Sequence, residues 1–282
     1  TSASENDVIK KIVPLKKKLR IKILRFGKNC KGNLSINYSK FFINKNKRLK
    51  YNYAKVKSNK PSFILFTSGS TGEPKGIVHS TGGYLVYTKF TCKKKFNISS
   101  NSVVLTASDA GWINGHTYAL YGPLSIGATT ILLEKPTSLL NKKILTDILS
   151  KLKVNILYFP VTLIRLIKAL KDQHRSKFNN LKLLGSMGEP LSKYIGSWFS
   201  NHYSSKKLQI INTYFQTETG GIISSPSYKD KLSSVPIGTV GKPITKNLGL
   251  FIDSKKNNEK AEIKIKNPWH GCMINVINNK NS

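Results

Sequence analysis

Residues 67–76, TSGSTGEPKG, combine glycine, hydroxyl and lysine side chains in one short loop. Such a loop can surround a phosphate, because glycine lets backbone N–H groups approach the anion and a lysine adds a positive charge. It is not a Walker A loop, which ends in Gly-Lys-Ser/Thr, because Pro74 precedes Lys75 and Gly76 follows it. The alternative is an ordinary flexible Gly/Ser turn. The candidate phosphate-binding residues are Thr67, Ser68, Gly69, Ser70, Thr71, Gly72 and Lys75.

Two later loops carry acidic residues that could face the same ligand. YFQTETGG (214–221) contains Glu218, one of only 13 acidic residues in the chain. Beside Thr217, this carboxylate could hold Mg²⁺ opposite the phosphate loop, with a surface glutamate in a turn as the alternative. In GSMGEP (185–190), Glu189 lies in a tight turn suited to packing against a flat ring.

A fourth loop, SDAGWINGH (108–116), adds aromatic and imidazole groups. Trp112 and His116 are four residues apart at a predicted helix start. Trp112 is expected in the core or in a pocket wall, and His116 is either a substrate contact or a structural histidine. We interpret His79, just after the phosphate loop, as structural. No Ser-His-Asp order, carboxylate pair or metal-ligand cluster is evident from the sequence.

The four loops follow short apolar runs that predict strands. Apolar residues recur at helical spacing between these runs, at 141–153 and 160–171. This alternation predicts an α/β fold with a parallel sheet covered by helices on both faces. Because ligands bind at the carboxyl ends of parallel strands, we expect the four loops to form one cleft. The predicted strands are 62–66, 102–107, 128–134, 155–159, 181–185 and 208–213, and the expected buried face of the second helix is Leu163, Leu166, Ile167 and Leu170.

Composition changes along the chain indicate three regions. Residues 1–60 are a basic, Asn/Lys-rich lead-in that we expect to be part of an incomplete α/β subdomain, and 61–225 hold the strand–helix alternation. Residues 226–282 change to Gly/Pro turns and short strands, which predicts a β-rich extension. No uninterrupted apolar stretch is long enough to cross a membrane.

The formal net charge of +34 raises the question of nucleic-acid binding. Only five of the 47 basic residues are arginine, however, and the lysines are spread over the whole chain. We therefore interpret the charge as a solvated surface and keep a basic nucleic-acid-binding protein as a lesser alternative. The three cysteines (Cys30, Cys92 and Cys272) lack metal-ligand spacing and indicate an intracellular, reducing compartment.

TSGSTGEPKG resembles the signature phosphate loop of the AMP-forming, adenylate-forming enzymes. Within that superfamily, GEPKGIVHSTGGYLVYT, DAGWINGHTYALYGPLSIGATTILLE, VNILYFPVTLIRLI, LLGSMGEPLS and NTYFQTETGG resemble the acetyl-CoA synthetases, or acetate–CoA ligases. The resemblance runs from about Pro61 to Gly271. It implies the large N-terminal domain of these ligases and a two-step reaction. Acetate and ATP give acetyl-adenylate and pyrophosphate, and coenzyme A then gives acetyl-CoA and AMP, with Mg²⁺ required.

The resemblance also implies roles for single residues, which make 61–225 an ATP- and acyl-binding region. The loop Thr67–Gly72 with Lys75 would surround the β- and γ-phosphates, Thr217 would contact the α-phosphate, and Glu218 would hold Mg²⁺. The adenine would be bordered by Gly188, Glu189, Pro190, Asn212, Thr213, Tyr214 and Phe215, with Gln216 adjoining the nucleotide. The acyl pocket would be walled by Trp112, Ile113, Asn114, Met187 and Phe215.

The chain departs from the family at several of these positions. Glu73 stands where the family usually has lysine, which removes a positive charge from the phosphate loop. Tyr214 and Phe215 replace two tryptophans, Met187 replaces a valine, and Asn114 replaces a threonine. The acyl pocket is thus altered but still small, so acetate is the expected substrate and propionate a possible one.

The resemblance covers the central part of such an enzyme. The chain ends before the family's hinge and C-terminal lysine domain, and its first residues resemble the interior of a longer chain. We therefore expect the isolated polypeptide to form adenylate poorly or not at all. A non-catalytic nucleotide-binding remnant of the same fold is the alternative.

Overall fold

The computed structural model describes residues 25–26, 35–36, 54–68, 73–133, 135–170, 177–253 and 262–277. The chain divides into two units, Thr1–Lys55 and Val56–Ser282. In the first unit, β1 (Arg25–Phe26) and β2 (Ser35–Ile36) pair in parallel. All other described elements belong to the second unit.

A five-stranded parallel sheet forms the centre of the second unit. Its strand order is β6-β5-β7-β8-β9, and every neighbouring pair is parallel. Side chains from both faces are buried, as the continuous apolar runs require. The predicted fold class is confirmed, with five of the six predicted strands in this sheet. The strands are β5 (Val103–Thr106), β6 (Thr129–Ile131), β7 (Ile156–Pro160), β8 (Leu183–Met187) and β9 (Ile210–Asn212).

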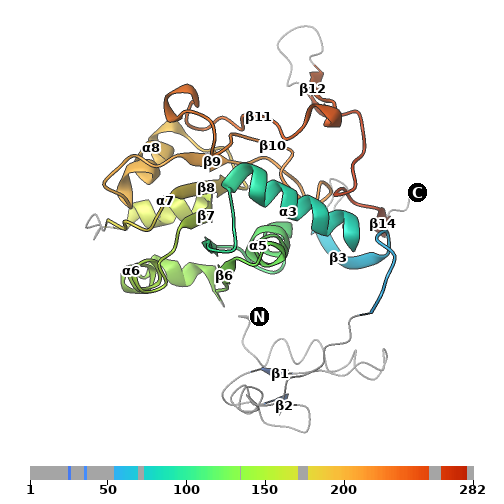
Figure 1. Cartoon of the computed structure of the whole chain (residues 1–282), viewed down its shortest axis with the longest axis horizontal. Helices are drawn as coiled ribbons and strands as arrows, with labels where there is room; N and C mark the ends of the chain where they lie inside the picture. Colours follow the sequence, from blue (N-terminus) through green and yellow to red (C-terminus); the bar gives the residue numbers. More distant parts are fainter. Residues whose placement is uncertain are drawn as a thin grey trace. The chain divides into compact units, whose positions relative to one another are not determined.

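Helices cover both faces of this sheet (Figure 1). On one face, α6 (Lys142–Lys151), α7 (Val161–Ala169) and α8 (Lys193–His202) pack against Leu105, Leu157 and Leu184. On the other face, α3 (Gly82–Phe96) and a helical segment that begins with α4 pack against Val104, Ile156 and Tyr158. Successive residues of a strand thus point to opposite cores. The segment consists of α4 (Ile113–His116), the π-helical η1 (Thr117–Tyr121) and α5 (Gly122–Ile126), and the 3₁₀ turn η2 (Pro136–Leu140) precedes α6.

The predicted buried face of α7 is partly wrong. Leu163 and Ile167 are buried, but Leu166 is 46% exposed and Leu170 is 38% exposed. Ile164 is fully buried instead. The helix ends at Ala169, so Leu170 lies beyond it. The buried stripe of α7 is rotated around the helix by about one residue relative to the predicted stripe.

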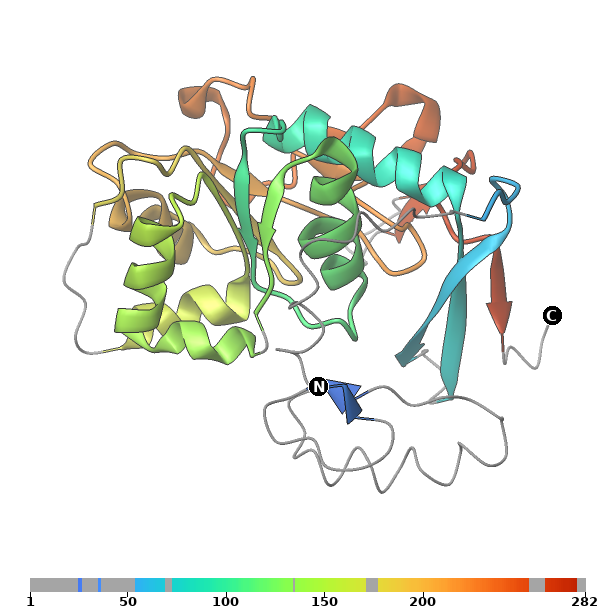
Figure 2. The same ribbon diagram turned by 60° about the horizontal axis from the view of Figure 1, so that its bottom comes forward.

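The remaining predicted strand is not part of the parallel sheet. β3 (Pro61–Ser68) forms an antiparallel hairpin with β4 (Pro74–Ser80), and β14 (Asn275–Ile277) pairs with the other edge of β4 (Figure 2). The predicted phosphate-loop residues therefore stand in the sequence between two antiparallel strands, and the prediction that they follow a parallel strand is wrong. Five residues are too few for the crossover that parallel strands need. Residues 69–72 lie outside the described residues.

The predicted β-rich extension is confirmed. It pairs β10 (Ser224–Ser225) with β11 (Lys242–Pro243) and β12 (Leu250–Asp253) with β13 (Glu262–Ile265), with 3₁₀ turns η3 (Leu232–Ser234) and η4 (Lys246–Leu248). The end of α3 binds this extension, because Lys94 Nζ donates to the Ile244 carbonyl at 2.7 Å. None of the helices that the structure describes has the length and apolar character needed to span a membrane.

Candidate functional site

One face of the β3–β4 hairpin carries the described ends of the predicted phosphate loop. The antiparallel register pairs Thr67 with Lys75, and residues two apart on a strand share a face. The side chain of Lys75 is half-buried, and its ammonium makes no hydrogen bond or ion pair with another described residue. The same face is buried further along, at Leu65, Ile77 and His79. We call Phe63, Leu65, Thr67, Lys75, Ile77 and His79 the inner face of the hairpin.

The segment after β9 forms a compact turn at residues 216–220. The amide N–H of Thr219 donates to the Gln216 carbonyl and that of Gly220 to the Thr217 carbonyl, both at 3.2 Å. The Thr219 hydroxyl also accepts from the Gln216 N–H at 2.9 Å. Gly220 has φ of +69°, a left-handed conformation that favours glycine. These local bonds fix the shape of the 216–220 turn.

Three separate elements hold the 216–220 turn in place. One contact comes from the inner face of the hairpin, one from η1 and one from the segment that leads into β14. All three are hydrogen bonds of 2.8 Å to backbone carbonyls of the turn. The donors and acceptors are His79 Nε2 to Thr217, Thr117 Oγ1 to Gly220, and the Met273 N–H to Glu218.

These contacts place β4, the strand that carries Lys75, beside the 216–220 turn that carries the candidate metal ligand Glu218. His79 touches Thr217, and Lys75 precedes His79 by four residues on the same face, about 13 Å along the strand. Glu218 is half-buried, and its carboxylate makes no hydrogen bond or ion pair with any residue that the structure describes. An ammonium and a carboxylate free of described partners are thus carried by two elements in direct contact. This arrangement suits an anion accompanied by a cation.

The predicted acyl-pocket residues are brought together in part. Phe215 packs against the cluster that contains Met187 and also against the cluster that contains Ile113. Ile113 and Met187 are buried, at 5% and 3% exposure. Trp112 is 69% exposed and therefore not in the core, and its role in a pocket wall stays a prediction. Asn114 is buried, and neither atom of its side-chain amide has a hydrogen-bond partner among the described residues.

The predicted adenine-border residues lie at the ends of β8 and β9. Gly188 has φ of +83°, and no atom lies within 4 Å of the place where a Cβ would be. The Glu189 carboxylate is held by α7, through Arg165 at 3.0 Å and the hydroxyl of Thr162. Since its side chain is engaged there, the part of Glu189 left to border a ring is its backbone.

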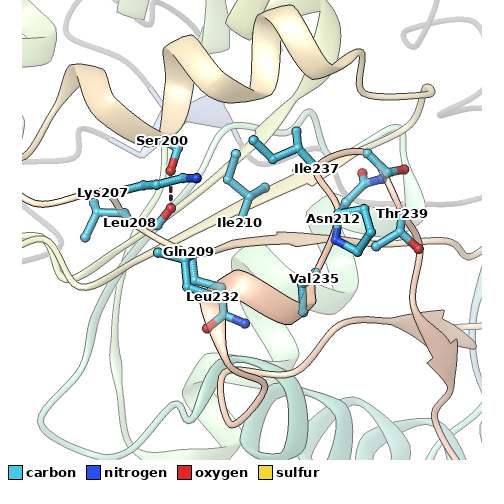
Figure 3. A pocket seen from close by; sticks show the side chains of 12 residues that line it. Ser200, Lys207, Leu208, Gln209, Ile210, Asn212, Leu232, Val235, Ile237 and Thr239 are labelled. Atoms are coloured by element: carbon cyan, nitrogen blue, oxygen red, sulfur yellow. Dashed lines mark hydrogen bonds between the residues drawn. The ribbon is translucent and has the colours of Figure 1, made fainter.

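Asn212, at the end of β9, is held on both sides of its amide. Its Oδ1 accepts from the Ser186 hydroxyl and its Nδ2 donates to the Gly238 carbonyl, both at 2.9 Å. Asn212 also lines a pocket of about 370 Å³, including open solvent, along the edge strand β9 (Figure 3). Figure 3 shows Asn212 beside Thr239 at one end of this pocket, with Lys207 at the other. Asn212 is the one predicted site residue that lines it.

The contacts that assemble the site were missed by the sequence reasoning. His79 is buried, as a structural histidine should be, but it also joins the hairpin to the 216–220 turn. Thr117 and Met273 carried no signal, because their contacts span 103 and 55 residues. The available signal was the spacing of Lys75 and His79, because residues four apart on one strand share a face.

Known proteins match this chain over most of its length. The AMP-binding enzyme family matches residues 3–273. The acetyl-coenzyme A synthetase of Psychromonas ingrahamii is 37% identical over 229 residues, which are 78% of this chain and 34% of that protein. The acetyl-coenzyme A synthetase of Yersinia pestis is 43% identical over 168 residues, 59% of this chain and 26% of that protein. The chain thus spans between a quarter and about a third of the length of these curated relatives.

A solved structure is similar in fold. The anthranilate CoA ligase AuaEII in complex with anthranoyl-AMP aligns with a TM-score of 0.67 and 21% identity, over 86% of this chain and 45% of that chain. At this identity the likeness shows the fold. The family match covers far more than half of the chain, and the relatives agree with it. The chain belongs to the family of AMP-binding enzymes.

Proposed function

We propose that this chain provides the nucleotide- and acyl-binding surface of a short-chain acyl-CoA synthetase. The reaction is acetate, ATP and coenzyme A to acetyl-CoA, AMP and pyrophosphate, through acetyl-adenylate. The observation that carries the proposal is the His79–Thr217 hydrogen bond, which joins the strand of Lys75 to the turn of Glu218. The relatives named acetyl-coenzyme A synthetase support the choice of acetate.

In this proposal the protein acts by positioning groups and neutralising charge. Attack of a carboxylate on the α-phosphate of ATP needs an aligned nucleophile and a stabilised leaving group. Lys75 would offset the charge of the β- and γ-phosphates, which leave as pyrophosphate. The Thr217 hydroxyl, at the start of the 216–220 turn, would orient the α-phosphate.

Glu218 would hold the Mg²⁺ that accompanies ATP. Mg²⁺ is usually bound through one or two carboxylates together with substrate phosphates and waters, so a single carboxylate without a described partner fits it. Among the described residues, no three His, Cys, Asp or Glu side chains gather to hold a metal by themselves. The fit is therefore to a metal that binds jointly with the nucleotide. When bound, it would offset the charge that develops on the phosphates.

The acyl group would lie among Ile113, Met187 and Phe215. These side chains are apolar, and Phe215 connects the two clusters that contain the others. An apolar site of this kind favours the methyl or ethyl group of acetate or propionate. Coenzyme A would then displace AMP from the mixed anhydride with its thiol.

A non-catalytic nucleotide-binding module is the second candidate. The observation that favours it is Glu73, which is exposed directly before β4. A carboxylate at this point opposes the charge of Lys75 and weakens attraction for a polyphosphate. Such a module would bind nucleotide without selecting an acyl group.

Stable analogues of acyl-adenylates separate the two candidates. We would measure binding of acetyl-, propionyl- and butyryl-sulfamoyl adenosine to the chain by calorimetry. The synthetase proposal predicts tighter binding of the acetyl and propionyl analogues than of AMP, and weaker binding of the butyryl analogue. Equal affinity for all of them would favour the non-catalytic module, and no binding to any would refute both.

A further inference from the structure

His79 is enclosed by aromatic rings on the inner face of the hairpin. It is fully buried, and its ring centroid lies 5.2 Å from that of Phe63 and 5.1 Å from that of Tyr84. His116 stacks on Phe63 at 4.7 Å, so the cage contains a second imidazole. Packing on several sides restricts the His79 ring to one orientation.

The hydrogen bond from this ring has a defined direction. The Thr217 carbonyl can only accept, so His79 Nε2 carries the proton and donates at 2.8 Å. Nδ1 is buried and has no hydrogen-bond partner among the described residues. Burial lowers the pKa of His79, in keeping with a neutral ring. Within the described structure, the His79 side chain therefore makes one hydrogen bond, the bond to the Thr217 carbonyl of the 216–220 turn.

The turn is packed closely onto the ring as well as bonded to it. A Cβ placed on Gly220 would lie 3.1 Å from His79 Cε1. The other two anchors, Thr117 and Met273, come from outside the β3–β4 hairpin. Among the described residues of the β3–β4 hairpin, His79 is the one that donates a hydrogen bond to the 216–220 turn.

We propose that His79 is a positioning residue, which sets the place of Thr217 and Glu218 relative to Lys75 through its Nε2–H. This role rests on the proposed function, because a nucleotide bound by both elements is what would sense their separation. If the bond is lost, the turn can move relative to the hairpin, and its own internal bonds open more often. Binding that needs both elements then weakens, while binding to the hairpin does not.

Two substitutions at this position distinguish positioning from simple packing. In His79→Gln, the side-chain Nε2 reaches about as far as the imidazole Nε2 and can donate to Thr217. In His79→Asn, the amide is one carbon shorter and does not reach. The exposed His270 gives a matched control, His270→Asn. Each variant would be titrated with ATP in the presence and absence of Mg²⁺.

We expect His79→Asn to bind Mg·ATP at least about tenfold more weakly, the scale of one unsatisfied buried carbonyl. Its affinity for ATP without Mg²⁺ should change much less, because Glu218 is the group displaced. His79→Gln and His270→Asn should resemble the wild type in both titrations. In the ligand-free protein, hydrogen exchange of the Thr219 and Gly220 amides should accelerate in His79→Asn and not in His79→Gln.

Several results would overturn the proposal. Wild-type affinity for Mg·ATP in folded His79→Asn is one, and equal losses with and without Mg²⁺ are another. If His79→Asn does not fold, His79→Gln decides alone: retained affinity supports the role of the donor, and a tenfold loss contradicts it. Absence of Mg·ATP binding by the wild type would instead refute the proposed function itself.

Discussion

Replacing Thr117 by valine removes a buried hydroxyl that anchors the 216–220 turn. Thr117 is fully buried, its Oγ1 donates to the Gly220 carbonyl at 2.8 Å, and the Tyr84 hydroxyl lies 2.7 Å from the same atom. Because the Thr117 proton goes to Gly220, the Tyr84 hydroxyl must donate to Thr117. Valine has nearly the same shape, so the substitution removes hydrogen bonds and leaves the packing in place.

The magnitude follows from the two groups left without partners. The Gly220 carbonyl and the Tyr84 hydroxyl both become unsatisfied, at about 1–3 kcal/mol each. We expect Thr117→Val to lower the free energy of unfolding by about 3 kcal/mol. For a unit of this size, that corresponds to a decrease in Tm of roughly 6–12 °C.

Thermal and urea unfolding would measure this loss, with Thr117→Ser as the control. Serine keeps the hydroxyl and loses one methyl group, so it should cost about 1 kcal/mol. In the double variant with Tyr84→Phe, the orphaned phenol is also removed. The combined cost should then be smaller than the sum of the single costs. A loss below about 0.5 kcal/mol in Thr117→Val, or equal losses in serine and valine variants, would refute the hydrogen-bond argument.

Three further predictions concern charge and burial. Glu73→Lys should tighten ATP binding by about fivefold at low salt and by less at high salt, since the position is exposed and its charge is screened. Calorimetry at two salt concentrations checks this, and an effect that does not depend on salt would contradict it. Asn114→Leu should leave Tm unchanged or raise it, because both atoms of the side-chain amide lack partners among the described residues. A decrease in the free energy of unfolding above about 1 kcal/mol would contradict this and reveal a bound water or other partner. Since burial lowers the pKa of His79 below its ordinary value of 6.5, protons favour the unfolded chain. The free energy of unfolding should therefore decrease as pH falls below 6.5, less steeply in His79→Gln, and equal pH dependence in both proteins would count against this assignment.

The parallel sheet could be predicted because its signals are local. Runs such as SVVLTA and NILYF are apolar on both faces, and helix-length segments separate them, so β5 and β7 followed from composition and spacing. The strand before the phosphate loop has the same local appearance. Its antiparallel pairing with β4 depends on partner choice, which periodicity does not encode.

The assembly of the site could not be predicted for a related reason. The His79–Thr217 bond joins residues 138 positions apart, and no spacing rule connects them. Similarly, the helical pattern of α7 identified Leu163 and Ile167 but not Ile164, because the sheet against which the helix packs selects the buried stripe. The residue types in the loops indicated phosphate and metal chemistry, whereas their distances were set by tertiary contacts.

Calorimetric titration of the chain with ATP, with and without Mg²⁺, tests most directly the claim that the hairpin and the 216–220 turn form one nucleotide site. The wild type, Lys75→Met, Glu218→Gln and the control Glu262→Gln, an exposed carboxylate on β13, would be compared. We predict that Lys75→Met weakens binding in both conditions, that Glu218→Gln removes the gain from Mg²⁺, and that Glu262→Gln changes neither. Mg²⁺-dependent binding that survives in Glu218→Gln, or ATP affinity unchanged in Lys75→Met, would contradict the account.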